Sequence, residues 1–273
     1  IRFRPTGERE DKIALKIFVI STPVFKVPIS GYGGLEVIAW QTAKGLAARG
    51  HQVSLAAPDG SECPNVQMIH FGPERTVDEQ GAYSKYWQHL LNQDVIIDSS
   101  WNKWSYILKA EGRLSKTPIL GVCHAPIATM LNSPPPGVDK PCLIGISENH
   151  AESIKMHLPG VGSRCCSNGI DLEYYKPIGL PRTNRYLFLA RFSKIKGPDL
   201  AIEACKAAGA GLDLIGDATI TNEPELLQAC KTAADGKQVR IHGNATRGEC
   251  VWWFSQAHAL LHPNKYFAEP FGL

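Results

Sequence analysis

The chain has 273 residues, of which 44% are hydrophobic, which is ordinary globular composition with enough apolar material for two cores. The formal net charge of +3 is too small to indicate a nucleic-acid-binding protein, although it suits a site for an anionic ligand. Eight cysteines without Cys-x-x-Cys or zinc-ligand spacing exclude a zinc site of the usual kind and predict a reducing, cytoplasmic location.

No stretch of the sequence is long and apolar enough to span a bilayer, and the charged N-terminus lacks a signal-peptide core. Basic residues gather near the start at Arg2, Arg4, Arg9 and Lys12. We interpret this segment as a solvated tail, with peripheral contact to a membrane surface as the alternative.

The first part of the chain alternates strands with helices. Ala14–Ser21 is a continuous apolar run, typical of a strand that is buried on both faces. A glycine-rich loop follows at residues 30–34, and the apolar spacing of Leu35–Arg49 predicts a helix that Gly50 ends. Further strands are expected at Gln52–Ala57, Val95–Asp98, Ile119–Cys123, Leu143–Ser147 and Arg164–Ser167, and further helices at Tyr83–Leu91, Lys103–Glu111 and Glu148–Leu158.

The alternation stops and then starts again. Tyr175–Asn184 contains Pro177, Gly179 and Pro181 and few large apolar residues, so it is interpreted as a linker. Beyond it, strands are expected at Arg185–Ala190, Leu212–Ile215, Val239–His242 and Ala259–His262, and helices at Pro198–Ala208, Pro224–Ala234 and Gly248–Gln256.

This pattern predicts an α/β protein with two doubly wound, Rossmann-like parallel-sheet domains, at residues 1–180 and 181–273. Ligands of such sheets bind at the carboxyl ends of the strands, so a cleft between the two domains is the expected site. The second domain has about four expected strands and the chain stops where another helix should begin. We therefore expect the second domain to be incomplete, or truncated.

The loop Ser30–Gly34 lies between the first expected strand and helix. Backbone amides of Gly33 and Gly34 could approach a phosphate closely, and the following helix N-terminus would attract its charge. A simple tight turn is an equal alternative, because the loop does not match the Gly-x-Gly-x-x-Gly dinucleotide pattern.

Two cations follow the first expected strand of the second domain. Arg191 and Lys196 lie on a short loop directly before a helix, where positive charge opposes the helix dipole unless an anion lies between them. A diphosphate would satisfy both side chains. Taken alone, the motif also fits a solvated basic loop.

Other candidate residues follow expected strands. His124 ends the strand before Ala125-Pro126, Asn168-Gly169 forms a turn, and Glu269 precedes the segment Pro270–Leu273. A lone histidine is more often structural than catalytic, and Glu269 could equally cap a helix.

Taken together, these motifs resemble the retaining GT-B glycosyltransferases called family four, over residues from about 15 to 273. The resemblance is carried, in order, by the Gly33-Gly34 loop followed by Glu36, the His124-Ala125-Pro126 strand end, Ser147 before a helix, the turn Asn168–Asp171, the Arg191-x4-Lys196-Gly197 loop and the segment Glu269–Leu273. The family's Glu-x7-Glu signature begins at Glu269, and its second glutamate would fall beyond Leu273.

The resemblance implies transfer of a sugar from a UDP- or GDP-linked donor to an acceptor hydroxyl, with retention of configuration and without a metal or cofactor. It implies that Arg191 and Lys196 stabilise the departing diphosphate, that Glu269 binds sugar hydroxyls and that His124 lies near sugar and acceptor. Donor contacts are expected from Gly33, Gly34, Gly216, Asp217, Gly243, Asn244, Phe271, Gly272 and Leu273. The acceptor would be a sugar, a lipid or a small molecule.

Two alternatives remain open. A nucleotide-sugar 2-epimerase could share the scaffold, although the sequence shows no clear extra pair of acid–base carboxylates. A non-catalytic fragment that binds a nucleotide or a partner protein is the other alternative.

Overall fold

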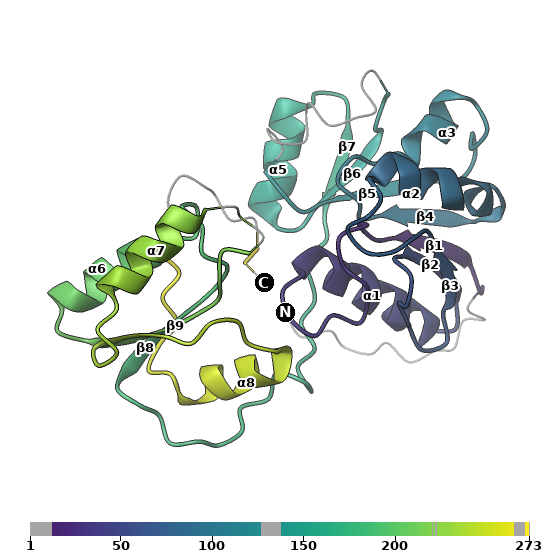
Figure 1. Cartoon of the computed structure of the whole chain (residues 1–273). Helices are drawn as coiled ribbons and strands as arrows, with labels where there is room; N and C mark the ends of the chain where they lie inside the picture. Colours follow the sequence, from purple (N-terminus) through teal and green to yellow (C-terminus); the bar gives the residue numbers. More distant parts are fainter. Residues whose placement is uncertain (1–12, 127–137, 220, 222, 265–270, 273) are drawn as a thin grey trace. The chain divides into compact units, whose positions relative to one another are not determined.

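A computed structural model of the chain describes residues 13–126, 138–219, 221, 223–264 and 271–272. The chain forms two compact units (Figure 1). Unit 1 comprises Ile1–Pro28 and Leu35–Ser167, and unit 2 comprises Ile29–Gly34 and Asn168–Leu273.

The division at residue 167 differs from the boundary near residue 180 that the proline-rich linker suggested. The intervening chain makes its contacts inside unit 2. The Tyr175 hydroxyl accepts a 2.8 Å hydrogen bond from Arg247, and the Ile178 amide donates to Ser255 Oγ at 3.2 Å. The linker is therefore part of the second unit.

Unit 1 is built on a seven-stranded parallel sheet with the order β3-β2-β1-β4-β5-β6-β7. Its strands are β1 (Lys16–Ile20), β2 (Gln52–Ala57), β3 (Gln67–His70), β4 (Val95–Asp98), β5 (Ile119–Cys123), β6 (Cys142–Gly145) and β7 (Gly162–Cys165). Its helices are α1 (Gly34–Ala47), α2 (Glu79–Tyr86), α3 (Tyr106–Ala110) and α5 (Glu148–His157), and a 3-10 helix, η1, spans Trp87–Asn92.

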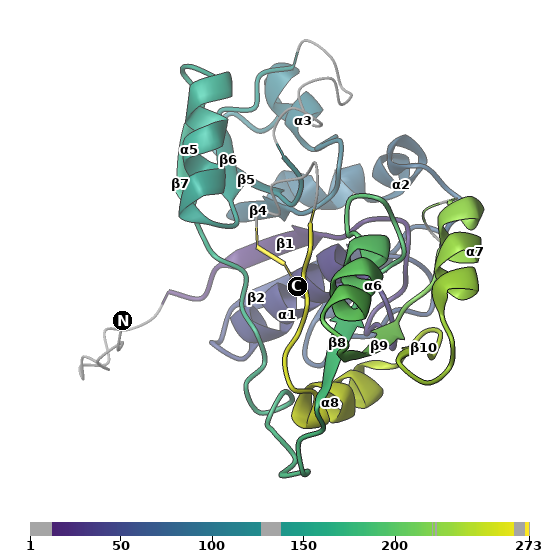
Figure 2. The same ribbon diagram turned by 90° about the vertical axis from the view of Figure 1, so that its left-hand side faces the viewer.

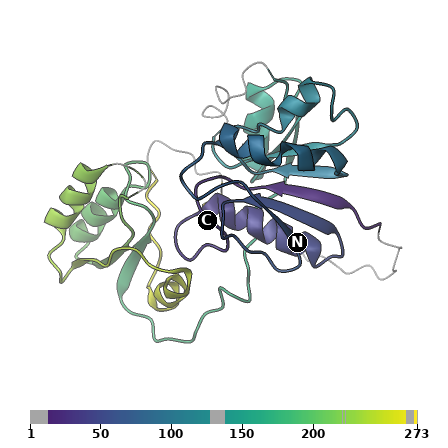
Figure 3. The ribbon, with the colours of Figure 1, turned by 45° about the vertical axis from the view of Figure 1, so that its right-hand side comes forward.

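Helices cover both faces of this sheet, with α1 on one face and α2 on the other (Figure 3). Phe18 and Ile20 of β1 belong to a buried cluster that also contains Tyr86, Leu90 and Tyr106. Because β1 is buried on both faces, its sequence is a continuous apolar run rather than an alternating one. The strand order reverses between β1 and β4, which is where such sheets bind ligands.

Unit 2 has a three-stranded parallel sheet in the order β10-β9-β8, whose strands lie side by side in Figure 2. Helices α6 and α7 lie on one side of it and α8 on the other (Figure 1). The elements are β8 (Arg185–Leu189), α6 (Pro198–Ala207), β9 (Gly211–Ile215), α7 (Pro224–Ala233), β10 (Val239–Ile241) and α8 (Arg247–Gln256).

The strand expected at Ala259–His262 is reduced to a single parallel bridge between Leu187 and Leu260. The apolar run is present, but in the described residues it pairs with β8 at only this position. The core of unit 2 lies on the face of α6 and α7, where Phe188, Leu212 and Leu214 pack together.

Candidate active site

The carboxyl edge of the unit 2 sheet brings together three loops that the sequence singled out. Strands β8, β9 and β10 are parallel and end at Leu189, Ile215 and Ile241. The loops that follow them therefore lie at the same edge of the sheet. These loops carry Arg191, Lys196, Gly216, Asp217, Gly243 and Asn244.

Backbone contacts hold these loops close together. Gly216 has φ 138°, and a Cβ atom on it would lie 2.0 Å from the Ala190 carbonyl oxygen, so only glycine fits. Its amide donates a 2.7 Å hydrogen bond to the carbonyl of Gly243. Gly216 thus joins the loops after β8 and β10.

The side chains of Asp217 and Asn244 are hydrogen-bonded to each other. One carboxylate oxygen of Asp217 accepts from the Asn244 side-chain amide, and the other accepts from the Thr219 amide at 3.0 Å. The Asp217 carbonyl accepts from the Phe192 amide at 2.6 Å. Both residues lie at the predicted edge, where their side chains fix the loops.

Arg191 and Ser193 carry polar atoms that the protein itself does not satisfy. The Arg191 Nε and the Ser193 Oγ are buried, and neither has a hydrogen-bond partner in the described part of the chain. A buried polar atom without a partner costs about 1–3 kcal/mol, so a ligand that satisfies such atoms is strongly favoured. Ser193 was not predicted, because a serine in a loop gives no sign that it will be buried.

Lys196 lies at the start of α6. Its amide donates a 2.9 Å hydrogen bond to the Ser193 carbonyl, which bends the loop tightly. The next residue, Gly197, is the N-cap with φ 67° and has no side chain to cap the helix. Lys196 and the first amides of α6 therefore lie in one short segment of the chain, a position that suits an anion.

The predicted glycine-rich loop belongs to unit 2 as residues 29–34. Its Tyr32 ring centre lies 5.9 Å from the Arg191 guanidinium carbon, and the Ser30 carbonyl accepts from the Arg247 amide at 2.8 Å. Gly33 is buried with φ 148°, and Gly34 begins α1. The structure thus brings this loop together with Arg191.

Arg247, at the start of α8, was missed by the sequence analysis. Its Nε is buried without a hydrogen-bond partner among the described residues, although its guanidinium also donates to the Tyr175 hydroxyl. An arginine in the first turn of a helix reads from the sequence as a solvated charge.

His124 follows β5 at the carboxyl edge of the unit 1 sheet. Burial, and then the charges of Lys103 and His150, lower the pKa of His124 to about 3, so its ring is neutral at physiological pH. Burial also lowers the pKa of His150, while its contact with the Ala125 backbone opposes the shift. The Nε2 atoms of both rings are buried without a hydrogen-bond partner in the described part of the chain.

Lys103 is a second residue of unit 1 that sequence analysis did not single out. It is 1% exposed, its φ is 57°, and its ammonium group donates to the Ser100 carbonyl. Nearby, Asp98 ends β4 and accepts hydrogen bonds from the Ser100 hydroxyl at 2.6 Å and the Ser105 hydroxyl at 2.5 Å. A fully buried lysine is rare, and residues with a strained, left-handed backbone cluster at functional sites.

Glu36, in the first turn of α1, is buried, and its carboxyl group accepts from the Thr22 hydroxyl. Burial raises its pKa, although the bond from Thr22 opposes the shift. Glu36 thus lies in the first turn of the helix that follows the Gly33-Gly34 loop, the first of the motifs on which the family resemblance is based.

The predicted residues Glu269 and Leu273 lie outside the described residues. Phe271 and Gly272 are described, and Gly272 has φ 75°.

Within the described residues, no group of three or more His, Cys, Asp or Glu side chains could hold a metal ion. None of the described helices combines the length and apolarity that a bilayer span requires.

Comparison with known proteins finds solved structures with a similar fold. No protein-family model matches the sequence, and no curated protein matches it. Among solved structures, 94% of the chain aligns with 74% of AviGT4, a glycosyltransferase involved in avilamycin A biosynthesis, at TM-score 0.67 and 20% identity. The same share aligns with 76% of Alr3699/HepE of Anabaena, solved with UDP-glucose, at TM-score 0.67 and 16% identity.

The catalytic domain of starch synthase IV from Arabidopsis thaliana, bound to ADP and acarbose, aligns over 95% of this chain and 80% of its own length, with TM-score 0.69 and 14% identity. UDP-N-acetylglucosamine 2-epimerase from Rickettsia bellii aligns over 90% and 73%, with TM-score 0.53 and 12% identity. The seven-stranded and three-stranded parallel sheets and these alignments show that the chain has the fold of the GT-B glycosyltransferases.

Proposed function

We propose that the protein transfers a sugar from a nucleoside-diphosphate-sugar to an acceptor hydroxyl, with retention of configuration, as a hexosyltransferase of the family-four type. The observation that carries the proposal is the edge of unit 2, where the buried and unsatisfied Arg191 Nε and Ser193 Oγ lie on the same loop as Lys196. These groups, together with the N-terminus of α6, form a binding site for a diphosphate.

In the proposed reaction, the bond between the anomeric carbon and the diphosphate oxygen breaks as the acceptor oxygen attacks the same face of the sugar. The acceptor proton passes to the departing phosphate oxygen. Arg191 and Lys196 stabilise the negative charge that grows on the diphosphate, and fixed charges of this kind usually supply the largest part of catalysis. No metal ion is needed in this scheme.

His124 is proposed to bind the sugar. Its ring is neutral at physiological pH, so the unpartnered Nε2 can donate to or accept from a hydroxyl according to its tautomer. Glu269 is proposed to bind other hydroxyls of the donor sugar. Phe271, Gly272 and Leu273 complete the proposed donor site.

A thermal-shift titration with UDP, GDP and ADP in the presence of a chelator tests the donor site. We expect one nucleoside diphosphate to stabilise the protein without metal. Lys196→Ala should abolish most of this shift, since it removes the cation beside α6. Lys194→Ala is the matched control, because Lys194 is exposed on the same loop, and this variant should keep the shift.

An unchanged shift in the Lys196→Ala variant would contradict the site. Retention is tested separately, by incubating the protein with the α-linked donor whose nucleotide binds. Water then acts as a slow acceptor, and proton NMR should detect the α-anomer of the released sugar before it mutarotates. Release of the β-anomer would show inversion.

The 2-epimerase alternative is favoured by one observation, the alignment with the Rickettsia bellii epimerase. It predicts an epimerised sugar nucleotide when the protein is incubated with donor and no acceptor. Detection of that product by NMR would replace the transferase proposal. Diphosphate binding with neither reaction would favour the non-catalytic alternative.

A further inference from the structure

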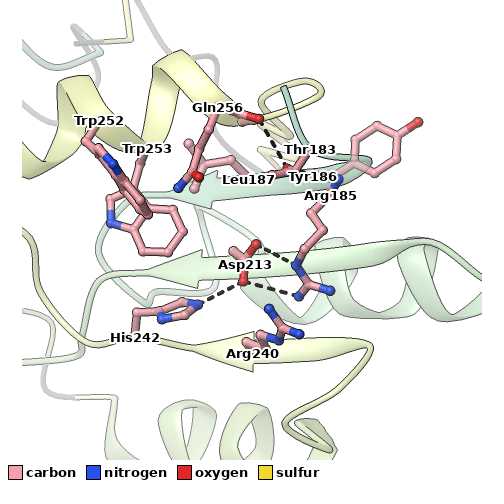
Figure 4. Close-up of a pocket in the computed structure, with 11 residues that line it drawn as sticks. Thr183, Arg185, Tyr186, Leu187, Asp213, Arg240, His242, Trp252, Trp253 and Gln256 are labelled. Carbon is pink, nitrogen blue, oxygen red and sulfur yellow. Dashed lines mark hydrogen bonds and ion pairs between the residues drawn. The ribbon is translucent and has the colours of Figure 1, made fainter. Parts of the chain in front are cut away.

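Unit 2 has a pocket on the face of its sheet that α6 and α7 do not cover. Alternate residues of a strand face opposite sides, so Leu212 and Leu214 enter the core whereas Asp213 faces the pocket. The pocket encloses about 240 Å³. Its lining includes Asp213, Arg240, His242, Trp252, Trp253 and Gln256 (Figure 4).

A rigid charged group forms one wall. Asp213 accepts from Arg185 Nε at 2.7 Å and lies 2.8 Å from His242 Nε2. Burial raises the pKa of Asp213, but its hydrogen bonds with Arg185 and His242 outweigh this and keep the pKa below its ordinary value. Arg185 also donates to the carbonyls of Leu212, Lys237 and Gln238, so all three nitrogen atoms of its guanidinium are hydrogen-bonded and hold it in place.

A row of aromatic rings forms another wall. The Trp253 ring centre lies 4.7 Å from that of Trp252 and 4.6 Å from that of His242. In Figure 4 the two indoles reach from α8 toward His242, which directly follows β10. Trp252 keeps 42% of its surface exposed, and no residue of α8 is fully buried. Flat indole surface at the mouth of a pocket suits the apolar C–H face of a sugar ring.

Two side chains bring hydrogen-bonding groups that the described residues do not use. The Arg240 guanidinium, on β10, makes no hydrogen bond or ion pair in the described part of the chain. The side-chain amide of Gln256, at the end of α8, makes none there either; the bond from Thr183 in Figure 4 goes to the backbone carbonyl of Gln256. Arginine offers five donors, and glutamine offers two donors and an acceptor. A ligand with many hydroxyl groups would use both.

We propose that this pocket binds a pyranose unit of an oligosaccharide, stacked on Trp252 and hydrogen-bonded by Arg240 and Gln256. An aromatic surface combined with a few fixed polar groups is the usual composition of a specific small-ligand site. Of its lining residues only His242 follows the end of a strand, and Arg191, Ser193 and Lys196 do not line the pocket, so it is separate from the proposed diphosphate site. The proposal does not depend on the proposed transferase activity.

The test is saturation-transfer NMR of the full chain with maltotriose, cellotriose, triacetylchitotriose and digalacturonate as probes. This ligand-observed signal does not rely on tryptophan emission, so tryptophan variants can be compared directly. We expect saturable binding of at least one probe, and a loss of affinity of at least about tenfold in Trp252→Ala. Arg240→Ala should weaken the same probe.

Phe254→Ala is the matched control. Phe254 lies on the same helix and is 43% exposed, against 42% for Trp252, but it does not line the pocket. This variant should bind the probe as the unchanged protein does. The thermal unfolding of each variant shows that it is folded.

Three results would overturn the proposal. The first is no saturable binding of any probe, and the second is equal binding by Trp252→Ala and the unchanged protein. The third is sedimentation of the unchanged chain as a dimer that Trp252→Ala dissociates, which would show that a second copy covers the pocket.

Discussion

Gly216 holds together the loops at the carboxyl edge of the unit 2 sheet, where diphosphate binding is proposed. A Cβ atom there would meet the Ala190 carbonyl oxygen at 2.0 Å, and φ is 138°. We expect Gly216→Ala to lower the free energy of unfolding by about 3 kcal/mol or more, since backbone must move. Urea unfolding followed by circular dichroism measures this.

Gly243→Ala separates steric clash from backbone strain. Gly243 also has a positive φ, 74°, but nothing lies within 4 Å of the Cβ position. Its replacement should cost only about 1 kcal/mol. Equal losses in the two variants would show that the close approach of Gly216 to Ala190 does not matter.

His124 should make stability depend on pH. Its pKa is about 3 in the folded protein and about 6.5 when unfolded, so the unfolded state takes up the proton first as pH falls. The buried, neutral His124 ring therefore contributes fully to the free energy of unfolding above about pH 6.5. This contribution is lost as pH falls toward about 3, and the free energy of unfolding decreases by up to about 1.4 kcal/mol per pH unit. His124→Gln should flatten this slope in urea unfolding at a series of pH values. Identical slopes would mean that the ring is not buried.

For single residues, the sequence indicated candidates by the chemistry of their side chains but did not indicate which side chains are buried. Arg191 and Lys196 were predicted because two cations before a helix need an anion. Ser193 and Lys103 were missed because their burial comes from tertiary packing, which leaves no trace in the local sequence. The roles of Arg191, Lys196 and His124 stay predictions until they are measured.

Among the elements, α8 begins with a capping box. The Thr246 hydroxyl accepts from the Glu249 amide at 3.3 Å, and the Glu249 carboxylate accepts from the Thr246 amide at 2.7 Å. Thr246→Ala should lower the free energy of unfolding by about 1 kcal/mol, whereas Thr246→Ser keeps the hydroxyl and should cost little. Urea unfolding distinguishes them. A loss in both variants would point to the methyl group of the threonine instead.

Elements with strong patterns were predicted closely. Gln52–Ala57, Val95–Asp98 and Ile119–Cys123 match strands β2, β4 and β5. These strands are apolar runs with clear boundaries. Helices that begin at proline, such as α6 and α7, were also placed well, because proline fits the first turn.

Short or polar elements were predicted less accurately. Strand β3, Gln67–His70, was missed because it has no apolar run and lies at the edge of its sheet. The helix expected at Tyr83–Leu91 is divided into α2 and the 3-10 helix η1, and that expected at Lys103–Glu111 shrinks to α3. The left-handed Lys103 lies before α3, which a pattern of apolar spacing cannot reveal.

For the whole molecule, the restart of the alternating pattern correctly predicted two α/β units with parallel sheets. The position of their boundary was harder to predict. Proline and glycine indicate a segment without helix or strand, but they do not indicate which unit that segment packs against. The contacts of Tyr175 and Ile178 decide this.

The eight free cysteines allow a check on the whole fold. Cys165 and Cys166 are exposed, Cys142 and Cys250 are half-buried, and the remaining four are buried. Burial also raises the pKa of Cys63 and Cys230 to about 11, which leaves little reactive thiolate. With an aromatic disulfide reagent at pH 8, we expect two thiols to react fast, and the buried four only after denaturation.

Replacing Cys165 and Cys166 with serine should remove the fast phase. A fast phase that survives this double replacement would show that one of the half-buried or buried thiols is accessible and that its unit is packed differently.

The membership of residues 29–34 in unit 2 has a consequence for synthesis of the chain. This segment leaves the ribosome before Arg191 and Arg247, which contact Tyr32 and Ser30, have been made. Domains generally fold as units in the order of synthesis, N-terminal first. Unit 2 cannot do so from consecutive residues alone, because its glycine loop must wait until Arg191 and Arg247 have been made before it finds its partners.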